Sequence, residues 1–207
     1  MKKQLTIKVP KDYSAITLKQ YLQLREEMEN YKDDPEAVEA LVFHYICDVP
    51  ADLVHKIDSE TYSKIREDLN SFMANTDYPL QTIIKVGDVE YGFEPNLSRM
   101  AYGAYLDISK YDTITIDKNW GKIMDILYRP ITRKAGTSYD IKPYDGNIDE
   151  DKWNSVGMDI HCGALFFLSG LLTDLVSFTQ KSLIHQEGIP HSIKSILERS
   201  GNRTPIS

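Results

Sequence analysis

The chain has 207 residues and a formal net charge of −7, and 42% of its residues are hydrophobic and 27% charged. These values are typical of a globular protein that buries a core, and the length suits one domain. They argue against a duplex-binding protein, which normally carries a basic face. No nucleic-acid partner is therefore predicted.

Negative charge is concentrated in the first part of the chain. From Thr17 to Ala74 there are 13 acidic and 6 basic residues, a balance of −7, so the remaining residues are neutral as a set. A solvated helix surface explains such a block most simply. A basic protein partner is the alternative explanation.

The N-terminal half is expected to be helical after one short strand. Apolar and polar residues alternate over residues 4–9, which predicts a strand. Residues that commonly cap helices then precede amphipathic stretches, and Pro50 ends one of these stretches. The expected helix starts are Thr17, Asp34 and either Asp58 or Ser59, with a short helix around Leu53.

The chain becomes rich in strand-forming residues between positions 80 and 94. Two such runs flank Gly87 and Asp88, a pair with glycine first that suits a type II′ hairpin turn. Pro95 ends the second run, because proline has no amide hydrogen to donate to a sheet. A helix from Asn96 or Ser98 to about Ile108 follows.

Another helix is expected between Asp117 and Pro130. Asp117 caps its start, and Tyr128 lies near its end. Pro130 breaks it, because the proline ring crowds the preceding turn. A flexible basic turn, "TRKAGTS", comes next, and residues near 139–144 then form a strand candidate.

The last large element is a helix from about Gly157 to Ile184. Leucines recur along it at spacings of three and four, opposite a stripe of small polar residues. It is therefore expected to be central to the fold without being covered on every side. Its most apolar run, residues 160–172, is shorter than the roughly 20 residues that span a bilayer, so no membrane contact is predicted.

Together these elements predict an α+β fold that is predominantly helical, with a small antiparallel sheet built on the hairpin near 80–94. No linker rich in Gly, Ser or Pro separates the two halves. Residues 1–187 are therefore interpreted as one integrated domain, with an acidic helical half at 1–76 and the hairpin and helices at 77–187. Residues 188–207 are interpreted as a C-terminal tail.

Histidines and cysteines show no spacing typical of a metal site. His161 and Cys162 are adjacent on a helix, where neighbouring side chains point about 100° apart, so the pair cannot chelate one ion unaided. Cys47 and Cys162 lie in apolar stretches and are expected to be buried free thiols, as in a reducing compartment. The start of the chain lacks the apolar core of a signal peptide, so a cytoplasmic location is expected.

The stretch from Trp120 to Gly146 is rich in aromatic and basic residues. Packing between a helix and a strand explains it most simply; a surface for a partner protein and a grip on single-stranded nucleic acid are the alternatives. The candidate partner-contact residues are Tyr128, Arg129, Arg133, Lys134, Tyr139 and Tyr144. An open cleft lined by Tyr128, Arg129, Tyr139 and Tyr144 beside ionisable neighbours would contradict the interpretation as packing.

No catalytic motif stands out in the chain. There is no G-x-S-x-G sequence, and the glycines of "YGFEPNLSRMAYG" are too widely spaced for a phosphate-binding loop. No catalytic residue, no cofactor and no metal ligand is therefore predicted, and the protein is not expected to be an enzyme. A small enzyme would require a pocket in which polar side chains with shifted pKa values converge.

The order of several segments resembles a group of tailed-bacteriophage morphogenesis and structural proteins. The segments are "LTIKVP", "KVGDVEYGFEPNLSRMAYGAYLDISKY", "NWGKIMDILYRPIT", "YDIKPYDG" and "GALFFLSGLLTDLVSFTQKSL". The opening "LTIKVP…TLKQYLQL" is similar to tail assembly chaperones. The resemblance covers roughly residues 2–185 and includes no catalytic motif.

The resemblance implies a non-enzymatic protein that binds other phage structural proteins. A tail assembly chaperone would bind apolar stretches of the tail tube or tape measure protein in the host cytoplasm. A structural virion component, such as a neck, adaptor or capsid-associated protein, is the alternative, and it would be found in the virion. These expectations rest on the resemblance and not on composition or periodicity.

Overall fold

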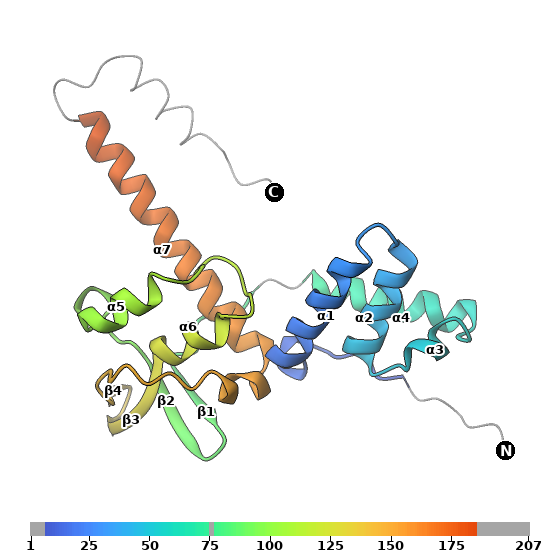
Figure 1. Ribbon diagram of the computed structural model, residues 1–207, viewed down its shortest axis with the longest axis horizontal. Coiled ribbons are helices and arrows are strands. Elements are labelled where there is room, and N and C mark those ends of the chain that lie inside the picture. Colours follow the sequence, from blue (N-terminus) through green and yellow to red (C-terminus); the bar gives the residue numbers. More distant parts are fainter. Residues whose placement is uncertain (1–6, 75–76, 186–207) are drawn as a thin grey trace.

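The computed structural model describes residues 7–74 and 77–185, with the side chains of the last helix described as far as Thr173. The α-helices are α1 (Leu18–Asn30), α2 (Pro35–Cys47), α3 (Ala51–Val54), α4 (Ser59–Met73), α5 (Tyr102–Ile108), α6 (Trp120–Leu127) and α7 (Met158–His185). The strands are β1 (Ile83–Val86), β2 (Val89–Phe93), β3 (Tyr128–Ala135) and β4 (Ser138–Ile141). Three short 3-10 helices are η1 (Tyr13–Ala15), η2 (Leu97–Arg99) and η3 (Asp151–Ser155). Helices α1 to α4 form a helical lobe beside a small sheet, and α7 extends away from both (Figure 1). The prediction of a mainly helical α+β fold is confirmed.

The predicted helix starts of the helical lobe are confirmed. Thr17 forms a capping box with Gln20, in which each side chain satisfies a backbone amide of the first turn. Asp34 and Asp58 accept hydrogen bonds from backbone amides three residues later, at 3.1 and 2.9 Å. Helix α2 ends earlier than the sequence suggested, because Asp48 after Cys47 adopts the left-handed conformation, with φ 55°.

The four strands form one antiparallel sheet in the order β1-β2-β3-β4. The turn between β1 and β2 is at Gly87 and Asp88, as predicted. Gly87 has a φ of 59°, and Asp88 is not among the described residues with positive φ. This combination is that of a type II′ turn, whose twist matches that of the flanking strands.

Strand β3 replaces the basic turn that the sequence suggested. Helix α6 ends at Leu127, and Tyr128 is already extended, with φ −106° and ψ 121°. Arg129 precedes a proline, and such residues are pushed out of the helical region of backbone space. The helix therefore ends before Arg129, and the expectation that Tyr128 is helical is wrong by one residue. The residues predicted as a flexible turn instead continue the strand and pair with β4.

Pro130 fits inside this sheet because the amide hydrogen that proline lacks would point away from β2, toward the chain that follows β4. Its carbonyl accepts a hydrogen bond from Lys142 N at 2.8 Å, so this edge of the residue faces the chain just beyond β4, which ends at Ile141. An antiparallel residue directs its N–H and C=O to the same side. The proline therefore removes no donor from the β2 side, and proline does not exclude β3 from the sheet.

Two other expectations differ from the structure. No strand is assigned to residues 7–9, and residues 4–6 lie outside the described part of the chain, so the predicted N-terminal strand is not present where it can be seen. The helix expected from Asn96 or Ser98 to Ile108 is divided into η2 and α5. Met100 and Ala101 between them are extended, with ψ near 140°, which interrupts the helix.

The core is built around α6 and η3. Trp120, Ile123, Leu127, Tyr128 and Trp153 are fully buried. Helix α6 continues directly into β3, and it packs against η3 and α5. The main cluster of buried apolar side chains also includes residues of α2 and α4, so it extends across both halves of the chain.

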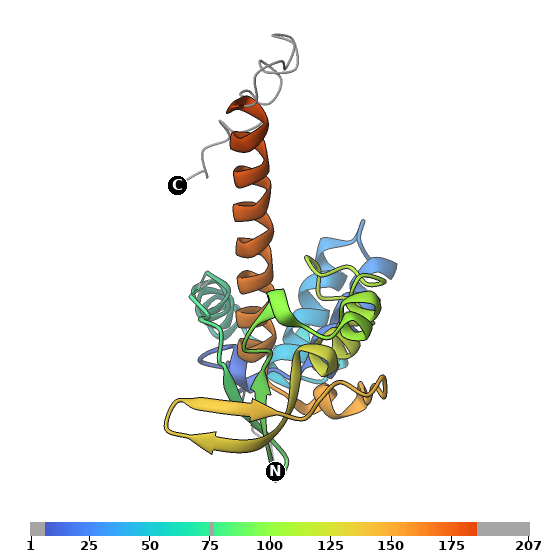
Figure 2. The same ribbon diagram turned by 90° about the vertical axis from the view of Figure 1, so that its left-hand side faces the viewer.

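Helix α7 packs only at its N-terminal end. Met158 and His161 are buried there, and the Phe167 ring contacts Phe93 of β2 with centroids 5.4 Å apart. The C-terminal part of the helix, called here its projecting part, leaves the body of the molecule in both views (Figure 1 and Figure 2). The sequence had predicted that this helix is central, and the helix that is buried apart from Lys122 is α6 instead.

Candidate functional site

The six candidate contact residues do not form one surface. Tyr128 is fully buried, its ring lies against Phe93 and Trp153, and its hydroxyl donates to Gln81 O at 2.7 Å. Arg129 is 8% exposed, and its guanidinium pairs with Glu94. Burial raises the pKa of Tyr128. These two residues are therefore part of the folded interior.

The other four candidates lie on the β3–β4 hairpin and on the loop after it. Arg133 and Lys134 are exposed on the β3–β4 hairpin and form ion pairs with Asp140 and Glu90. Their exposure leaves a partner contact there as a prediction. The remaining two are tyrosines: Tyr139 lies across Gly92 and donates to Phe93 O, and Tyr144 donates to Asp107.

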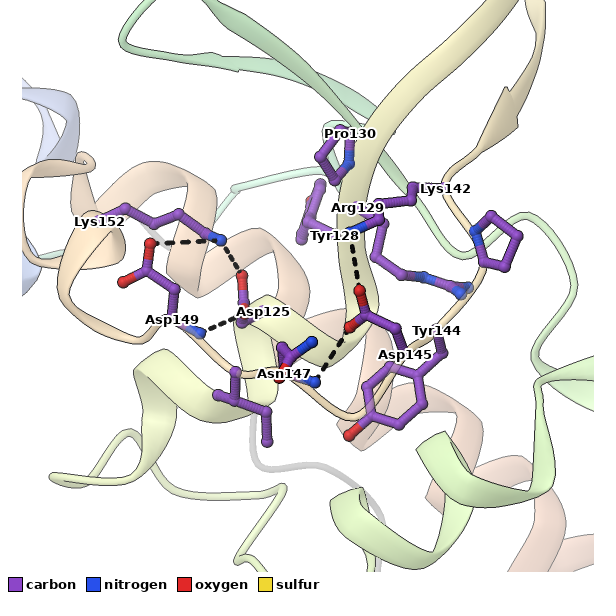
Figure 3. Close-up of a pocket in the computed structure, with 12 residues that line it drawn as sticks. Asp125, Tyr128, Arg129, Pro130, Lys142, Tyr144, Asp145, Asn147, Asp149 and Lys152 are labelled. Atoms are coloured by element: carbon purple, nitrogen blue, oxygen red, sulfur yellow. Dashed lines mark hydrogen bonds and ion pairs between the residues drawn. The ribbon is translucent and has the colours of Figure 1, made fainter.

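A pocket of ≈ 270 Å³ lies where α6 passes into β3 (Figure 3). Its wall includes Tyr128 and Arg129 from that junction and Tyr144 from the loop that follows β4. Ionisable side chains from α6, the loop and η3 complete it. Three of the four residues named as a test of the packing interpretation thus line an open pocket, while Tyr139 does not. Packing alone is therefore an incomplete account of this segment.

Asp125 is the buried charge of the pocket. Its carboxylate, 6% exposed, accepts hydrogen bonds from Asp149 N at 2.7 Å and Trp153 Nε1 at 3.1 Å. Lys152 forms an ion pair with it. Buried charges are tolerated when such partners replace water. Asp125 therefore ties the 142–149 loop and η3 to the central helix, a function that the sequence did not reveal.

The rim of the pocket is also paired. Lys142 Nζ lies 2.7 Å from an Asp145 carboxylate oxygen, and Asp145 also accepts a hydrogen bond from Asn147 N at 3.0 Å. These donors lower the pKa of Asp145 to about 2, and the carboxylate raises the pKa of Lys142. Burial, and then the contact with Asp107, raise the pKa of Tyr144.

These pKa shifts keep each group in its ordinary protonation state at neutral pH. Asp145 becomes harder to protonate, and Lys142 and Tyr144 become harder to deprotonate. A general base or acid needs a pKa moved toward neutrality, and here the shifts go the other way. Each charged side chain lining the pocket has a partner of opposite charge within the described residues. The arrangement therefore favours a structural clamp over proton transfer.

The two thiols and His161 lie near the core rather than in the pocket. Cys47 is buried and Cys162 is half-buried, and both are free. Burial raises the pKa of each thiol to about 11, so both are protonated and poorly nucleophilic at neutral pH. His161 is fully buried, and neither ring nitrogen has a hydrogen-bond partner among the described residues.

His161 should make the fold sensitive to mild acid. Burial lowers its pKa to about 4, against the opposing effect of the Trp153 and Val156 carbonyl groups. An unfolded histidine titrates near 6.5, so between these values the unfolded chain takes up a proton that the folded chain refuses. The free energy of unfolding should fall by about 2 kcal/mol from pH 7 to pH 5 through this residue alone.

Urea denaturation of the wild type and of His161→Leu at the two pH values measures this effect. The variant keeps the apolar packing and removes the titrating ring, so its loss of stability on acidification should be smaller by that amount. Carboxylates titrate in both proteins and cancel in the comparison. Equal acid sensitivity of the two proteins would contradict the assignment.

Apolar side chains are exposed on α5 and on the projecting part of α7. Tyr102 is 74% exposed and Tyr105 59% exposed on the short helix α5. On α7, Phe166, Leu171 and Leu172 are each more than 40% exposed. The spacing of leucines along α7 and its incomplete cover were expected from the sequence, but which of its apolar side chains the described elements leave exposed was not.

Comparison with protein-family models, with curated proteins and with solved structures gave no match for this chain. Within the parts of the chain that the structure describes, no helix combines the length and apolar character needed to cross a membrane. Among the same residues no three His, Cys, Asp or Glu side chains group as metal ligands.

Proposed function

We propose that this protein is a non-enzymatic binding factor in bacteriophage tail assembly that acts as a chaperone. It would bind apolar stretches of the tail tube or tape measure protein before assembly. The phage context comes from the resemblance of the segment order, from "LTIKVP" to "GALFFLSGLLTDLVSFTQKSL", to tailed-phage morphogenesis proteins. The projecting part of α7 is the structural observation that carries the proposal.

Leu171 and Leu172 of α7 are each more than 40% exposed. No other described element covers the projecting part of this helix in either view (Figure 1 and Figure 2). Adjacent large apolar side chains left in water on an otherwise unsupported helix are typical of a surface that another protein covers. Burying a leucine side chain contributes about 2 kcal/mol. A partner that covers both residues therefore gains part of the free energy that binding requires, without any chemical step.

A Leu171→Glu/Leu172→Glu variant should lose at least about tenfold in affinity for its partner, because two charges would have to be buried in the contact. Both side chains are already exposed, so the thermal unfolding midpoint should hardly change. The measurement is pull-down and titration with purified tail tube and tape measure proteins of the same phage.

Val89→Glu serves as the matched control, since Val89 is 45% exposed on the β1–β2 hairpin, away from α7. It should bind as the wild type does. Failure of the wild-type protein to bind either phage protein would remove the chaperone proposal. Equal loss in the control and in the α7 variant would remove α7 as the contact.

A structural role in the virion is the second candidate, because the same exposed helix would also suit a permanent contact between subunits. The two candidates differ in where the protein ends up. Mass spectrometry of purified particles should find a virion component in fixed stoichiometry, and should not find a chaperone. A tape measure gene immediately downstream would also favour the chaperone.

A further inference from the structure

Two apolar grooves cross the helical lobe and meet at Val38 of α2. One, of ≈ 460 Å³, lies along α1 and includes Leu24 and Met28. The other, of ≈ 280 Å³, lies between α2 and α4 and includes Val42 and Met73. Since Val38 lines both, the two grooves form one apolar track across α2, called here the α2 track.

The α2 track has the character of a surface that accepts a helix. Its apolar side chains come from three helices of the lobe, and Met73 is 47% exposed. Methionine side chains such as Met28 and Met73 are flexible and polarisable, so they adapt to different apolar partners. An amphipathic helix binds such a groove with residues spaced at i, i+3, i+4 and i+7.

The chain segment around the α2 track is strongly acidic. From Glu26 to Glu39 the chain has seven carboxylates and one lysine, Lys32. Of the seven, Glu39 alone forms an ion pair within the described residues, with Arg66 at 3.4 Å. Arg25 also lines the track, and its guanidinium donates to the Ile116 carbonyl. Lys32 and Glu29 line the first groove, and Arg66 and Glu39 line the second. The walls themselves therefore carry no excess of negative charge, which comes instead from the carboxylates of the chain around them.

This charge selects among occupants. An acidic helix would be repelled from the α1–α2 end of the lobe, whereas lysine or arginine flanking an apolar stripe would be attracted and steered toward it. The segment from Thr17 to Ala74, which contains the lobe helices, carries the whole net charge of −7, since the rest of the chain is neutral overall. Charge complementarity thus favours an amphipathic segment whose polar residues are basic over one whose polar residues are acidic.

We propose that the α2 track binds a basic amphipathic helix of a partner protein. The inference deepens the proposed function by stating the partner's chemistry, and it rests on that function only in taking the occupant to be another protein. The contact lies on the helical lobe, apart from the projecting part of α7 (Figure 1). The two surfaces can therefore be inactivated separately.

The test uses the full chain and two labelled synthetic helices in fluorescence anisotropy. Both peptides carry leucine at i, i+3, i+4 and i+7, and the remaining positions are lysine in one and glutamate in the other. The lysine peptide should bind at least about tenfold more tightly at low salt. Its advantage should shrink as salt is raised, because ions screen the charges outside the groove.

Val38→Glu separates insertion into the track from simple charge attraction. The substitution makes the lobe more acidic, so binding that depended on charge alone would become tighter. A helix bound in the track would instead bind about tenfold more weakly, because the new carboxylate would lie in the apolar groove that the helix must cover. Met73→Glu is the second variant for the same test, should the first not fold by circular dichroism. Val89→Glu, on the β1–β2 hairpin, is the control and should leave peptide binding unchanged, and Leu172→Glu reports whether the peptide contacts α7 instead.

Equal binding of the two peptides, or undiminished binding to a folded Val38→Glu or Met73→Glu variant, would overturn the proposal. Loss in Leu172→Glu alone would move the contact to α7. A peptide of residues 188–207 is the third probe, since this segment has three basic residues and one acidic residue. Binding restricted to that peptide would assign the track to the chain's own C-terminus. Capture of tail proteins by wild type and by Val38→Glu alike would leave the proposed function standing while this inference fails.

Discussion

An Arg129→Met variant should lose about 3 kcal/mol or more of its free energy of unfolding. The Arg129 and Glu94 side chains are only 10% and 9% exposed, and they form an ion pair at the edge of the pocket. Removing one partner leaves the Glu94 carboxylate in a poorly hydrated place with no cation beside it. The penalty is therefore the uncompensated charge, and it should appear as a lower urea midpoint at pH 7.

A double variant, Arg129→Met/Glu94→Leu, tests that explanation. Replacing both members of a buried pair by apolar residues is often nearly neutral, so the double variant should recover most of the lost stability. Arg133→Met is the matched control. Arg133 lies farther along the same strand and pairs with Asp140 in solvent, and exposed ion pairs contribute little to stability. A loss in the double variant as large as in the single one would show that packing, rather than charge, explains the effect.

Asp125→Ala should also be strongly destabilising, by about 3 kcal/mol. The substitution leaves Trp153 Nε1 and Asp149 N without their acceptor and leaves Lys152 without its closest carboxylate. The loop of residues 142–149 should then separate from α6. Limited trypsin digestion should reveal this as faster cleavage after Lys152, beside a lower thermal midpoint.

Asp149→Ala is the control for this variant. The Asp149 side chain is 68% exposed and lies 3.9 Å from Lys152, so its loss should change stability little. Its backbone amide, which donates to Asp125, is retained in the variant. If Asp125→Ala were as stable and as resistant to trypsin as this control, the clamp would not hold the loop in solution.

Elements whose ends are decided locally could be predicted. The helix starts at Thr17, Asp34 and Asp58 depend on one side chain reaching an amide three residues away. The turn at Gly87 depends on one residue that tolerates positive φ. The free state of both cysteines likewise agreed with their apolar neighbours.

Strand β3 could not be recognised from the same kind of reasoning. Its charged end, "TRKA", has the composition of a turn, and Pro130 usually argues against a sheet. It is a strand because β2 and β4 lie on its two sides and supply its hydrogen bonds. Strand preference is weak and depends on neighbours that are distant in the sequence.

The pocket illustrates the same limit for a site. The aromatic and basic residues from Tyr128 onward drew attention in the sequence, but the buried centre of the pocket is Asp125. Nothing in the spacing of Asp125, Asp149 and Lys152 along the sequence indicates that these residues meet. They meet because the loop after β4 brings Asp149 and Lys152 back to α6. Glu94, the residue after β2, was not predicted as the partner of Arg129 either.

By itself the sequence determined the class of the fold, the acidic character of the N-terminal block, the starts of α1, α2 and α4 and the apolar stripe of α7, because each follows from composition or from contacts within one turn. It did not determine the starts of α5 and α6, which lack a side-chain cap. The tertiary structure decided which apolar surfaces are covered. It buried Tyr128 and Arg129, left Leu171 and Leu172 in solvent, and joined two grooves at Val38. Burial is a property of what packs against a residue, and that partner is supplied by the rest of the chain.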